Sequence, residues 1–404
     1  MDKPLSGIKV IELADYVSAP VCARVLADMG AEVIKIERKT GNAWRETAKQ
    51  GCPWRFTDQE NPDYDINNTG KRHIMLNLKT PEGLSVCHKM LETADVFVTN
   101  MRVQALRRLG LDHDSLKDKY PGLIYAIGLG YGEKGPDANK PAFDHTAFWA
   151  RSGFLLDTAP MSSDYHPVFP PSSVGDNFTG MTLAAEICAA LFNRMKTGKG
   201  DYVRSSLFHN GLFAMGAMLI ATQGPDGAPY PRTRPLHGVA FGDYVCKDGQ
   251  YIYIASGYAE KLIPKVFTVI GREDLIDDPR FSTFSARIEN ADELHEIIRK
   301  AIVQRNADEW LRFGEEADIP IVKMLHFREA SEDEQALANG YIQEIEYPSG
   351  IKYRTPSSPI EMDSVGELRT EPTKAIGADT ESVLKAYGYT EEELAQLRNK
   401  GAIN

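Results

Sequence analysis

The sequence lacks the features that mark secreted, membrane-spanning or metal-binding proteins. Its five cysteines never form a Cys-x-x-Cys pair, and its nine histidines have no His-x-x-x-His spacing. These patterns argue against a disulfide framework and against a convergent set of metal ligands, so we expect no metal site. No stretch reaches the ~20 consecutive apolar residues that a membrane-spanning helix needs, and we expect no signal peptide. We therefore predict a cytoplasmic protein without membrane association.

Positive charge is scarce relative to negative charge. Lysine and arginine number 46 against 57 aspartate and glutamate residues, which gives a formal net charge of −11. An acidic surface repels the phosphates of nucleic acids, so nucleic acid is not an expected partner. An anionic ligand has to find a local group of basic side chains.

Several common catalytic motifs are also missing. The chain has no Gly-x-Ser-x-Gly elbow and no phosphate-binding loop ending in Gly-Lys-Ser/Thr, which weighs against ordinary hydrolases and kinases. The segment "GLGYGEKGP" (residues 128–136) follows a predicted strand, but its glycines do not fit Gly-x-Gly-x-x-Gly. A proline also stands where the helix that receives a pyrophosphate would begin. Nicotinamide or flavin binding is therefore not expected.

Strand and helix patterns alternate along the first ~130 residues. Short apolar runs predict strands, and the longer segments between them have helical patterns, including one with Thr80 as its cap and Pro81 at its first position. This alternation predicts a doubly wound α/β domain with a parallel sheet. The predicted strands are residues 8–13, 32–37, 73–78, 95–99 and 123–130, and the predicted helices are residues 19–30 and 79–94.

The pattern changes after residue 199. Asp248-Gly249 lies between two strand-like segments and predicts a hairpin, and helical segments follow, so residues 225–335 are predicted to form a smaller α+β domain. A second hairpin is predicted to turn at residues 348–350. Near the C-terminus, Thr390 and Glu393 have the spacing of a capping box.

Basic residues follow three of the predicted strands. In an open α/β sheet, ligands bind at the carboxyl ends of the strands, so these residues could together form an anion site. The alternative is that they are ordinary solvated surface residues. The residues concerned are Arg38, Lys39, Lys79, Arg107 and Arg108.

Residues 174–196, "VGDNFTGMTLAAEICAALFNRMK", place a Gly-Asp-Asn sequence directly before an apolar helical segment. Aspartate is a preferred residue at a helix start, where it accepts a backbone hydrogen bond. Taken alone, this pattern favours Asp176 as a helix cap, and the pattern does not decide whether Asp176 also reacts.

Three segments together are similar to one known family. They are "GIKVIELADYVSAPVCARVLADMGAEVIKIER" (residues 7–38), "NKPAFDHTAFWARSG" (residues 139–153) and "VGDNFTGMTLAAEICAALFNR" (residues 174–194). In this order they resemble the family III CoA-transferases, and the resemblance extends over essentially the whole chain. The segments "DEWLRFGEEADIPI" and "EDEQALANGY" resemble the branch that moves CoA between an enoyl-CoA and a 2-hydroxy acid such as phenyllactate or 2-hydroxyisocaproate.

The resemblance implies an architecture and a set of site residues. It implies an interlocked homodimer, with a Rossmann-like CoA-binding domain (residues 1–224), the small α+β domain (residues 225–335) and a C-terminal segment (residues 336–404) that returns to the large domain. The family's catalytic aspartate falls on Asp176. Its CoA-contacting positions fall on Tyr16, Val17, Arg38, Leu76, Lys79, Asn100, Met101 and Arg108.

The implied reaction needs a carboxylate and no tightly bound cofactor. Asp176 would attack an acyl-CoA to give a mixed anhydride and then an aspartyl-CoA thioester, from which a carboxylic acid takes up CoA. Coenzyme A therefore enters as part of the acyl-CoA substrate. Because one thioester replaces another, neither ATP nor a metal is required.

Three positions bear on the substrate pocket. Val17 stands where formyl-CoA transferase has glutamine, which indicates a larger organic acid than formate or oxalate. Gly257, in "IASGYAEK", is the candidate for the glycine-rich lid of the family. Asp144 aligns with an acidic residue near the family's active site, and either a substrate-orienting or a purely structural role is open to it.

Two alternatives remain open. An α-methylacyl-CoA racemase has the same fold but needs an opposed acid and base, and its histidine position is occupied here by Phe143, with His145 two residues further on. The second alternative is a non-catalytic CoA-binding protein. The intact motif around Asp176 argues against that alternative.

Overall fold

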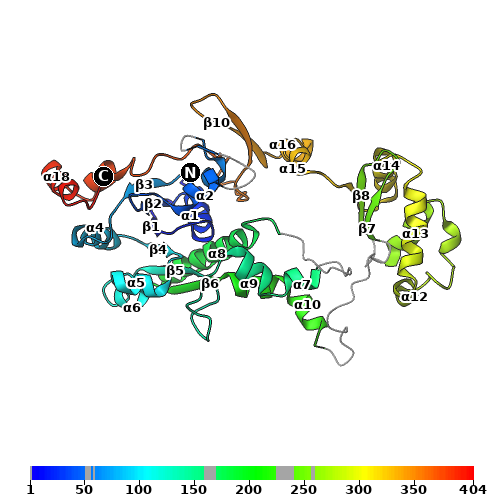
Figure 1. The fold of residues 1–404 in the computed structure, drawn as a ribbon, viewed down its shortest axis with the longest axis horizontal. Coiled ribbons are helices and arrows are strands. Elements are labelled where there is room, and N and C mark those ends of the chain that lie inside the picture. Colours follow the sequence, from blue (N-terminus) through cyan, green and yellow to red (C-terminus); the bar gives the residue numbers. More distant parts are fainter. Residues whose placement is uncertain (1, 51–55, 58–59, 159–169, 224–240, 256–259) are drawn as a thin grey trace. The chain divides into compact units, whose positions relative to one another are not determined.

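The computed structural model describes residues 2–50, 56–57, 60–158, 170–223, 241–255 and 260–404 (Figure 1). The chain divides into two compact units. Unit 1 comprises Met1–Asp157, Val168–Gly224 and Glu334–Asn404, and unit 2 comprises Thr158–Pro167 and Pro225–Asp333. The domain boundaries expected from the sequence stay predictions.

Unit 1 is built on a six-stranded parallel sheet with the strand order β3-β2-β1-β4-β5-β6. This is the doubly wound α/β arrangement, so the predicted fold class is confirmed. The sixth strand was not predicted, because its sequence "YVRSS" has no apolar run and is partly exposed. The strands are β1 (Lys9–Leu13), β2 (Glu32–Glu37), β3 (Arg72–Met75), β4 (Val96–Thr99), β5 (Ile124–Leu129) and β6 (Tyr202–Ser206).

Helices cover both faces of this sheet (Figure 1). The helices described in unit 1 are α1 (Ser18–Asp28), α2 (Ala43–Gln50), α3 (Pro62–Asp65), α4 (Pro81–Leu91), α5 (Val103–Leu109), α6 (His113–Leu116), a π-helical segment η1 (Asp144–Ala150), α7 (Phe154–Thr158), α8 (Val174–Thr197), α9 (Leu207–Ala214), α10 (Gly216–Ala221), α16 (Glu334–Ala338), α17 (Thr380–Ala386) and α18 (Glu391–Asn399). Thr80 caps α4 and Thr390 caps α18 through their hydroxyl groups, as predicted.

Side chains alternate between two buried layers along the central strands. Ile11 of β1 belongs to the layer that contains α4, α5, α17 and α18, whereas its neighbour Val10 belongs to the layer of α1 and α8. Such burial on both faces is typical of a parallel sheet. Helices α1 and α8 approach closely at Gly180, where an added Cβ would lie 2.5 Å from the carbonyl oxygen of Ser18. The glycine therefore allows α8 to lie against the start of α1.

The C-terminal part of unit 1 covers the open edge of the sheet at β3. The His73 backbone N–H donates to the Asp379 carboxylate (2.9 Å), and the Asp379 N–H donates to the His73 carbonyl (2.9 Å). Further along, the Asn77 N–H donates to the carbonyl of Ala402 (2.8 Å). These bonds satisfy backbone groups that an uncovered edge strand would expose.

Both predicted hairpins are confirmed. In unit 2, β7 (Phe241–Val245) and β8 (Tyr251–Ala255) are antiparallel, and β9 (Ile321–Lys323) completes a three-stranded sheet. In unit 1, β10 (Ile342–Glu346) and β11 (Lys352–Pro356) pair across the predicted turn. The helices of unit 2 are the 3₁₀ segments η2 (Glu260–Leu262) and η3 (Glu273–Leu275), and α11 (Ile263–Val269), α12 (Phe284–Glu289), α13 (Ala291–Ile302), α14 (Ala307–Ala317) and α15 (Phe327–Ala330). Among the helices described, none combines the length and hydropathy required to cross a bilayer.

Candidate active site

Asp176 lies in the first turn of α8 and is not its cap. The helix begins at Val174, with Ser173 in the cap position at φ 69°. The cap interpretation is therefore wrong, because the helix starts earlier than the Gly-Asp-Asn pattern suggested. The Asp176 backbone N–H instead donates to the Asp144 carboxylate (3.1 Å).

Two carboxylates meet at this helix start because Gly175 lets η1 approach. A Cβ at Gly175 would lie 2.4 Å from Asp144 Oδ1 and 2.2 Å from Phe148 Cγ. Asp144 is 4% exposed, and its other oxygen accepts the indole N–H of Trp149 (3.0 Å). Any side chain at position 175 would separate the helix from the Asp144 carboxylate.

The ionisation of Asp176 is set by its surroundings. Burial and then the charge of Asp144 raise the pKa of Asp176 to about 7, although hydrogen bonds from the Ser18 hydroxyl and backbone N–H oppose the rise. Burial also raises the pKa of Asp144. A carboxyl group with a pKa near neutrality is present in both ionised and protonated forms at physiological pH. Asp176 can therefore supply a poorly solvated carboxylate.

A cavity of about 500 Å³ lies at the carboxyl ends of β1 to β4. Arg38, Leu76, Lys79 and Met101 line it together, so the structure brings these four predicted positions into one place. Lys39 also lines the cavity. Arg38 and Lys79 are exposed, and the position at the strand ends agrees with the ligand-binding edge of open α/β sheets. The cavity can therefore receive an anionic ligand.

The other predicted ligand positions border the cavity or lie apart from it. Asn100 is not part of its lining but exchanges hydrogen bonds with the backbone of Asp15, which does line it (3.0 and 2.7 Å). Tyr16 has φ 60° in the turn after β1, and Val17 is buried. Arg108 is exposed on α5 and is not among the lining residues.

The turn from Asp15 to Ser18 joins the cavity to Asp176. Asp15 lines the cavity, and three residues later Ser18 makes the hydrogen bonds to the Asp176 carboxylate. Between them, the Tyr16 ring packs edge-on against Phe143 (5.2 Å between centroids). A ligand anchored at the strand ends thus has a short path to the carboxylate.

The remaining sequence predictions have different outcomes. The His145 ring pairs with the carbonyl oxygen of Pro170 (3.3 Å), a contact that does not involve Asp176. Gly257 lies outside the described residues. Arg107 lies on α5, 3.8 Å from the carboxylate of Asp112. In the described part of the chain, no group of three or more His, Cys, Asp or Glu side chains is arranged to hold a metal ion.

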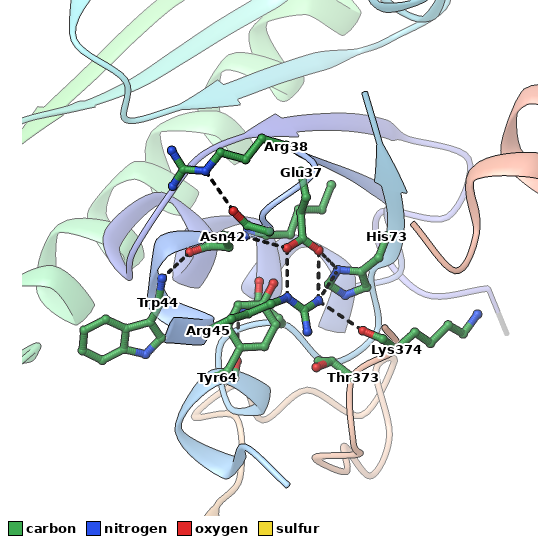
Figure 2. A network of polar contacts seen from close by, with 12 residues as sticks. Glu37, Arg38, Asn42, Trp44, Arg45, Tyr64, His73, Thr373 and Lys374 are labelled. Carbon is green, nitrogen blue, oxygen red and sulfur yellow. Dashed lines mark hydrogen bonds and ion pairs between the residues drawn. The ribbon is translucent and has the colours of Figure 1, made fainter. Parts of the chain in front are cut away.

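A buried polar network, shown in Figure 2, was not predicted from the sequence, and its members Glu37 and Asn42 border the cavity. Glu37 binds the Arg45 guanidinium through both oxygens (2.9 Å each) and pairs with His73 Nδ1 (2.8 Å). The available signal was a glutamate at the end of a predicted strand whose apolar residues are Val33, Ile34 and Ile36. Its partners could not be identified, because His73 is 36 positions away along the chain.

Comparisons with known proteins identify the family of the chain. The family model for CoA-transferase family III matches residues 5–380. The (R)-2-hydroxy-4-methylpentanoate CoA-transferase of Clostridioides difficile is 37% identical over 402 residues, which cover 99% of both chains. The cinnamoyl-CoA:phenyllactate CoA-transferase of Clostridium sporogenes is 39% identical over 403 residues, covering 97% of this chain and 95% of the relative.

Solved structures extend the comparison to the fold. A CAIB/BAIF family protein from Brucella suis has a TM-score of 0.78 and 26% identity, covering 96% of this chain and 100% of that one. The resemblance seen in the sequence motifs is thus confirmed by the family match, by near full-length relatives and by the fold. The chain belongs to CoA-transferase family III.

Proposed function

We propose that this enzyme moves CoA from a 2-enoyl-CoA to an (R)-2-hydroxy acid with an aryl or branched alkyl side chain. The names of the two relatives above describe acids of this kind. The observation that carries the proposal is the partly buried Asp176 carboxylate, hydrogen-bonded by Ser18 at one end of a turn whose other end lines the cavity. CoA would be a substrate component, with no tightly bound cofactor.

The proposed reaction runs through two kinds of acyl intermediate on Asp176. The ionised carboxylate attacks the thioester carbonyl, and the C–S bond breaks to release the CoA thiolate and leave a mixed anhydride. The thiolate then attacks the aspartyl carbonyl, which releases the donor acid and forms an aspartyl-CoA thioester. The acceptor carboxylate attacks this thioester, and the C–S bond breaks to release the CoA thiolate and form a second anhydride. The thiolate finally attacks the acceptor carbonyl, which forms the new acyl-CoA and releases the Asp176 carboxylate.

The surrounding residues suit this chemistry. Arg38 and Lys79 would bind the phosphates of CoA at the cavity, since exposed cations pair readily with phosphate oxygens. The N-terminal end of α8 supplies a positive dipole near charge that develops at Asp176. The buried Asp144 would hold the Asp176 backbone in place through its 3.1 Å hydrogen bond. Both intermediates hydrolyse readily, so the site must exclude water during turnover.

We further propose that the protein acts in the cytoplasm as the interlocked homodimer of its family. The four cysteines within the described residues are free thiols, as a reducing compartment favours. Large apolar side chains on α8 and α9 are exposed in the single chain, with Phe192 61% and Phe213 76% exposed. Such exposure is typical of a surface that a partner covers.

The test of the chemistry is a covalent adduct. The enzyme is mixed with cinnamoyl-CoA, quenched within a single turnover and digested. The mass of the peptide that contains Asp176 is then measured by mass spectrometry. We expect a CoA or acyl adduct on that peptide. A lack of adduct, together with loss of the α-hydrogen of a saturated 2-methylacyl-CoA to solvent when no acceptor acid is present, would favour the racemase alternative.

A matrix of donors and acceptors tests the substrate class. Phenyllactate and 2-hydroxy-4-methylpentanoate are offered as acceptors beside formate and oxalate, with CoA-ester formation followed by chromatography. We expect turnover with the two larger acids. A preference for formate or oxalate would contradict the proposed class, and binding of acyl-CoA without any turnover would favour a non-catalytic CoA-binding protein.

A further inference from the structure

One wall of the cavity is the short loop of residues 38–42, which joins β2 to α2. Within it, Arg38 Nε donates to the carbonyl of Gly41 (2.9 Å), and Gly41 has φ 77°. At its end, the Asn42 side-chain oxygen accepts the backbone N–H groups of Tyr16 (3.2 Å) and Trp44 (2.8 Å). The loop thus has a defined conformation that presents Arg38 at the cavity.

Glu37 holds this loop from its buried side (Figure 2). The Glu37 carboxylate, in a residue only 2% exposed, accepts the Asn42 backbone N–H (2.9 Å) as well as both bonds from Arg45. Burial alone would raise the pKa of Glu37, but the hydrogen bonds from His73 and Arg45 hold that pKa well below its usual range. The Glu37 carboxylate therefore ties the two ends of loop 38–42 to the β3 strand.

A segment from the far end of the chain supports the same loop from outside. We call residues 371–380 the strap. The carbonyl of Lys374 in the strap accepts Arg45 Nη2 (3.1 Å), although the two residues are 329 positions apart. Ile376 packs against the loop so closely that a Cβ at Gly41 would lie 2.6 Å from Ile376 Cδ1. Asp379 fixes the end of the strap to His73.

These contacts connect a remote segment to the cavity wall without reaching Asp176. The network lies within unit 1, and its polar bonds join the β2 end, α2, β3 and the strap. A buried carboxylate that satisfies an Arg, a His and a backbone N–H holds its neighbours in one arrangement, because losing any bond leaves a buried polar group unpaired. The geometry restrains the loop before any ligand arrives.

We propose that Glu37 and Ile376 are positioning residues for the CoA portion of the substrate, acting through loop 38–42. They would set the place of Arg38 and the Gly41 backbone against the anionic, phosphate-bearing part of CoA, and they would not take part in acyl transfer. The inference rests on the proposed function, since it assumes that CoA occupies the cavity.

The first test compares two glutamates at opposite ends of the same strand. Glu37→Gln keeps the side-chain shape but removes the charge that binds Arg45, whereas the control Glu32→Gln removes an exposed ion pair with Arg72 at the other end of β2. We expect Glu37→Gln to raise the KM for cinnamoyl-CoA by about tenfold, with kcat and the KM for the acceptor acid within about twofold. Glu32→Gln should leave all three unchanged.

A second variant covers the case in which Glu37→Gln fails to fold. Ile376→Ala removes the strap contact to Gly41 without unpairing any buried charge, and we expect it to weaken CoA binding by about threefold to tenfold in calorimetry with CoA alone. Folding is checked by circular dichroism and by the thermal midpoint.

The outcomes separate this inference from the proposed function. Lys79→Ala serves as the reference, because the Lys79 side chain is exposed at the cavity, whereas Glu37, which also borders it, is only 2% exposed. If Lys79→Ala weakens CoA binding but folded Ile376→Ala and Glu37→Gln do not, the positioning role is refuted and the CoA cavity stands. If wild-type protein binds no CoA, or Lys79→Ala has no effect, the cavity assignment itself fails. A fall in kcat at unchanged KM in Glu37→Gln would also overturn the positioning role.

Discussion

The cavity and the carboxylate pair at the start of α8 differ in both charge and exposure. The cavity presents Arg38 and Lys79 at the surface, whereas Asp144 is 4% exposed and Asp176 has a pKa raised to about 7. Exposed cations can attract an anion at little desolvation cost, while a buried carboxylate is costly to ionise and is poorly solvated once ionised. Under the proposed function, CoA affinity and acyl-transfer chemistry therefore reside on separate elements that one turn joins.

The largest effect is expected for a substitution of Asp176, which should lower kcat without changing the affinity for CoA. Asp176→Ala removes the proposed nucleophile but none of the cavity-lining side chains, so kcat should fall by at least ~10³-fold while the Kd for CoA stays within about threefold. Rapid-quench kinetics and calorimetry measure the two quantities. Unchanged turnover would remove Asp176 from the mechanism, and a parallel loss of CoA binding would show that the two regions are not separate.

A slightly smaller loss of kcat is expected when the start of α8 is displaced. Gly175→Ala places a Cβ 2.2 Å from Phe148 Cγ and 2.4 Å from Asp144 Oδ1, so α8 and η1 must move apart. We expect kcat to fall by about 10²-fold and the free energy of unfolding to fall by about 1–3 kcal/mol. Gly216→Ala in α10 has open space around its Cβ and, like Gly175, no positive φ, so it controls for an added methyl group on a helix without a clash. Equal activity losses in both variants would contradict the packing explanation.

A substitution in the cavity is expected to change KM rather than kcat. Lys79→Ala removes an exposed cation, and the KM for acyl-CoA should rise about tenfold with kcat nearly unchanged, because a phosphate contact contributes about 1.4 kcal/mol. Lys117→Ala, which removes an exposed lysine paired with Asp114, is the matched control. The difference between the two variants should shrink as salt is raised. A fall in kcat for Lys79→Ala would contradict the assignment of affinity and chemistry to two separate regions.

The smallest effect concerns the pH dependence of the reactive carboxylate. The charge of Asp144 contributes to the raised pKa of Asp176, so Asp144→Asn should lower that pKa and leave Asp176 ionised at lower pH. The acid limb of kcat/KM, which lies near pH 7 when this group limits activity, should therefore move to lower pH, with kcat reduced less than about tenfold. A limb that stays in place or moves to higher pH would show that Asp144 does not control this ionisation.

Local patterns predicted much of the fold but little of the site geometry. The apolar runs of β1 and β2 and the capping threonines Thr80 and Thr390 depend on nearby residues, and each was confirmed. The cap assignment of Asp176 was wrong, because the start of α8 depends on packing between Gly175 and η1 rather than on local propensity. Propensity rules do not include such contacts.

The ligand residues show the same division. Arg38 and Lys79 could be placed at strand ends from the sequence, because parallel strands bring their carboxyl ends to one edge. The resemblance to the family added Leu76 and Met101, and the structure places all four at one cavity. The support behind them from Glu37 could not be predicted, since its partners come from distant segments.

The sequence by itself determined five of the six strands of the parallel sheet and the helices α1 and α4 between them, because periodicity and capping are properties of neighbouring residues. Through its motifs it also determined the family. Only the tertiary structure decided that Asp144 lies against the backbone of Asp176, that Ser18 binds its carboxylate and that the strap supports the cavity loop. The reason is physical: these arrangements depend on burial and close approach between segments that become neighbours only when the chain has folded.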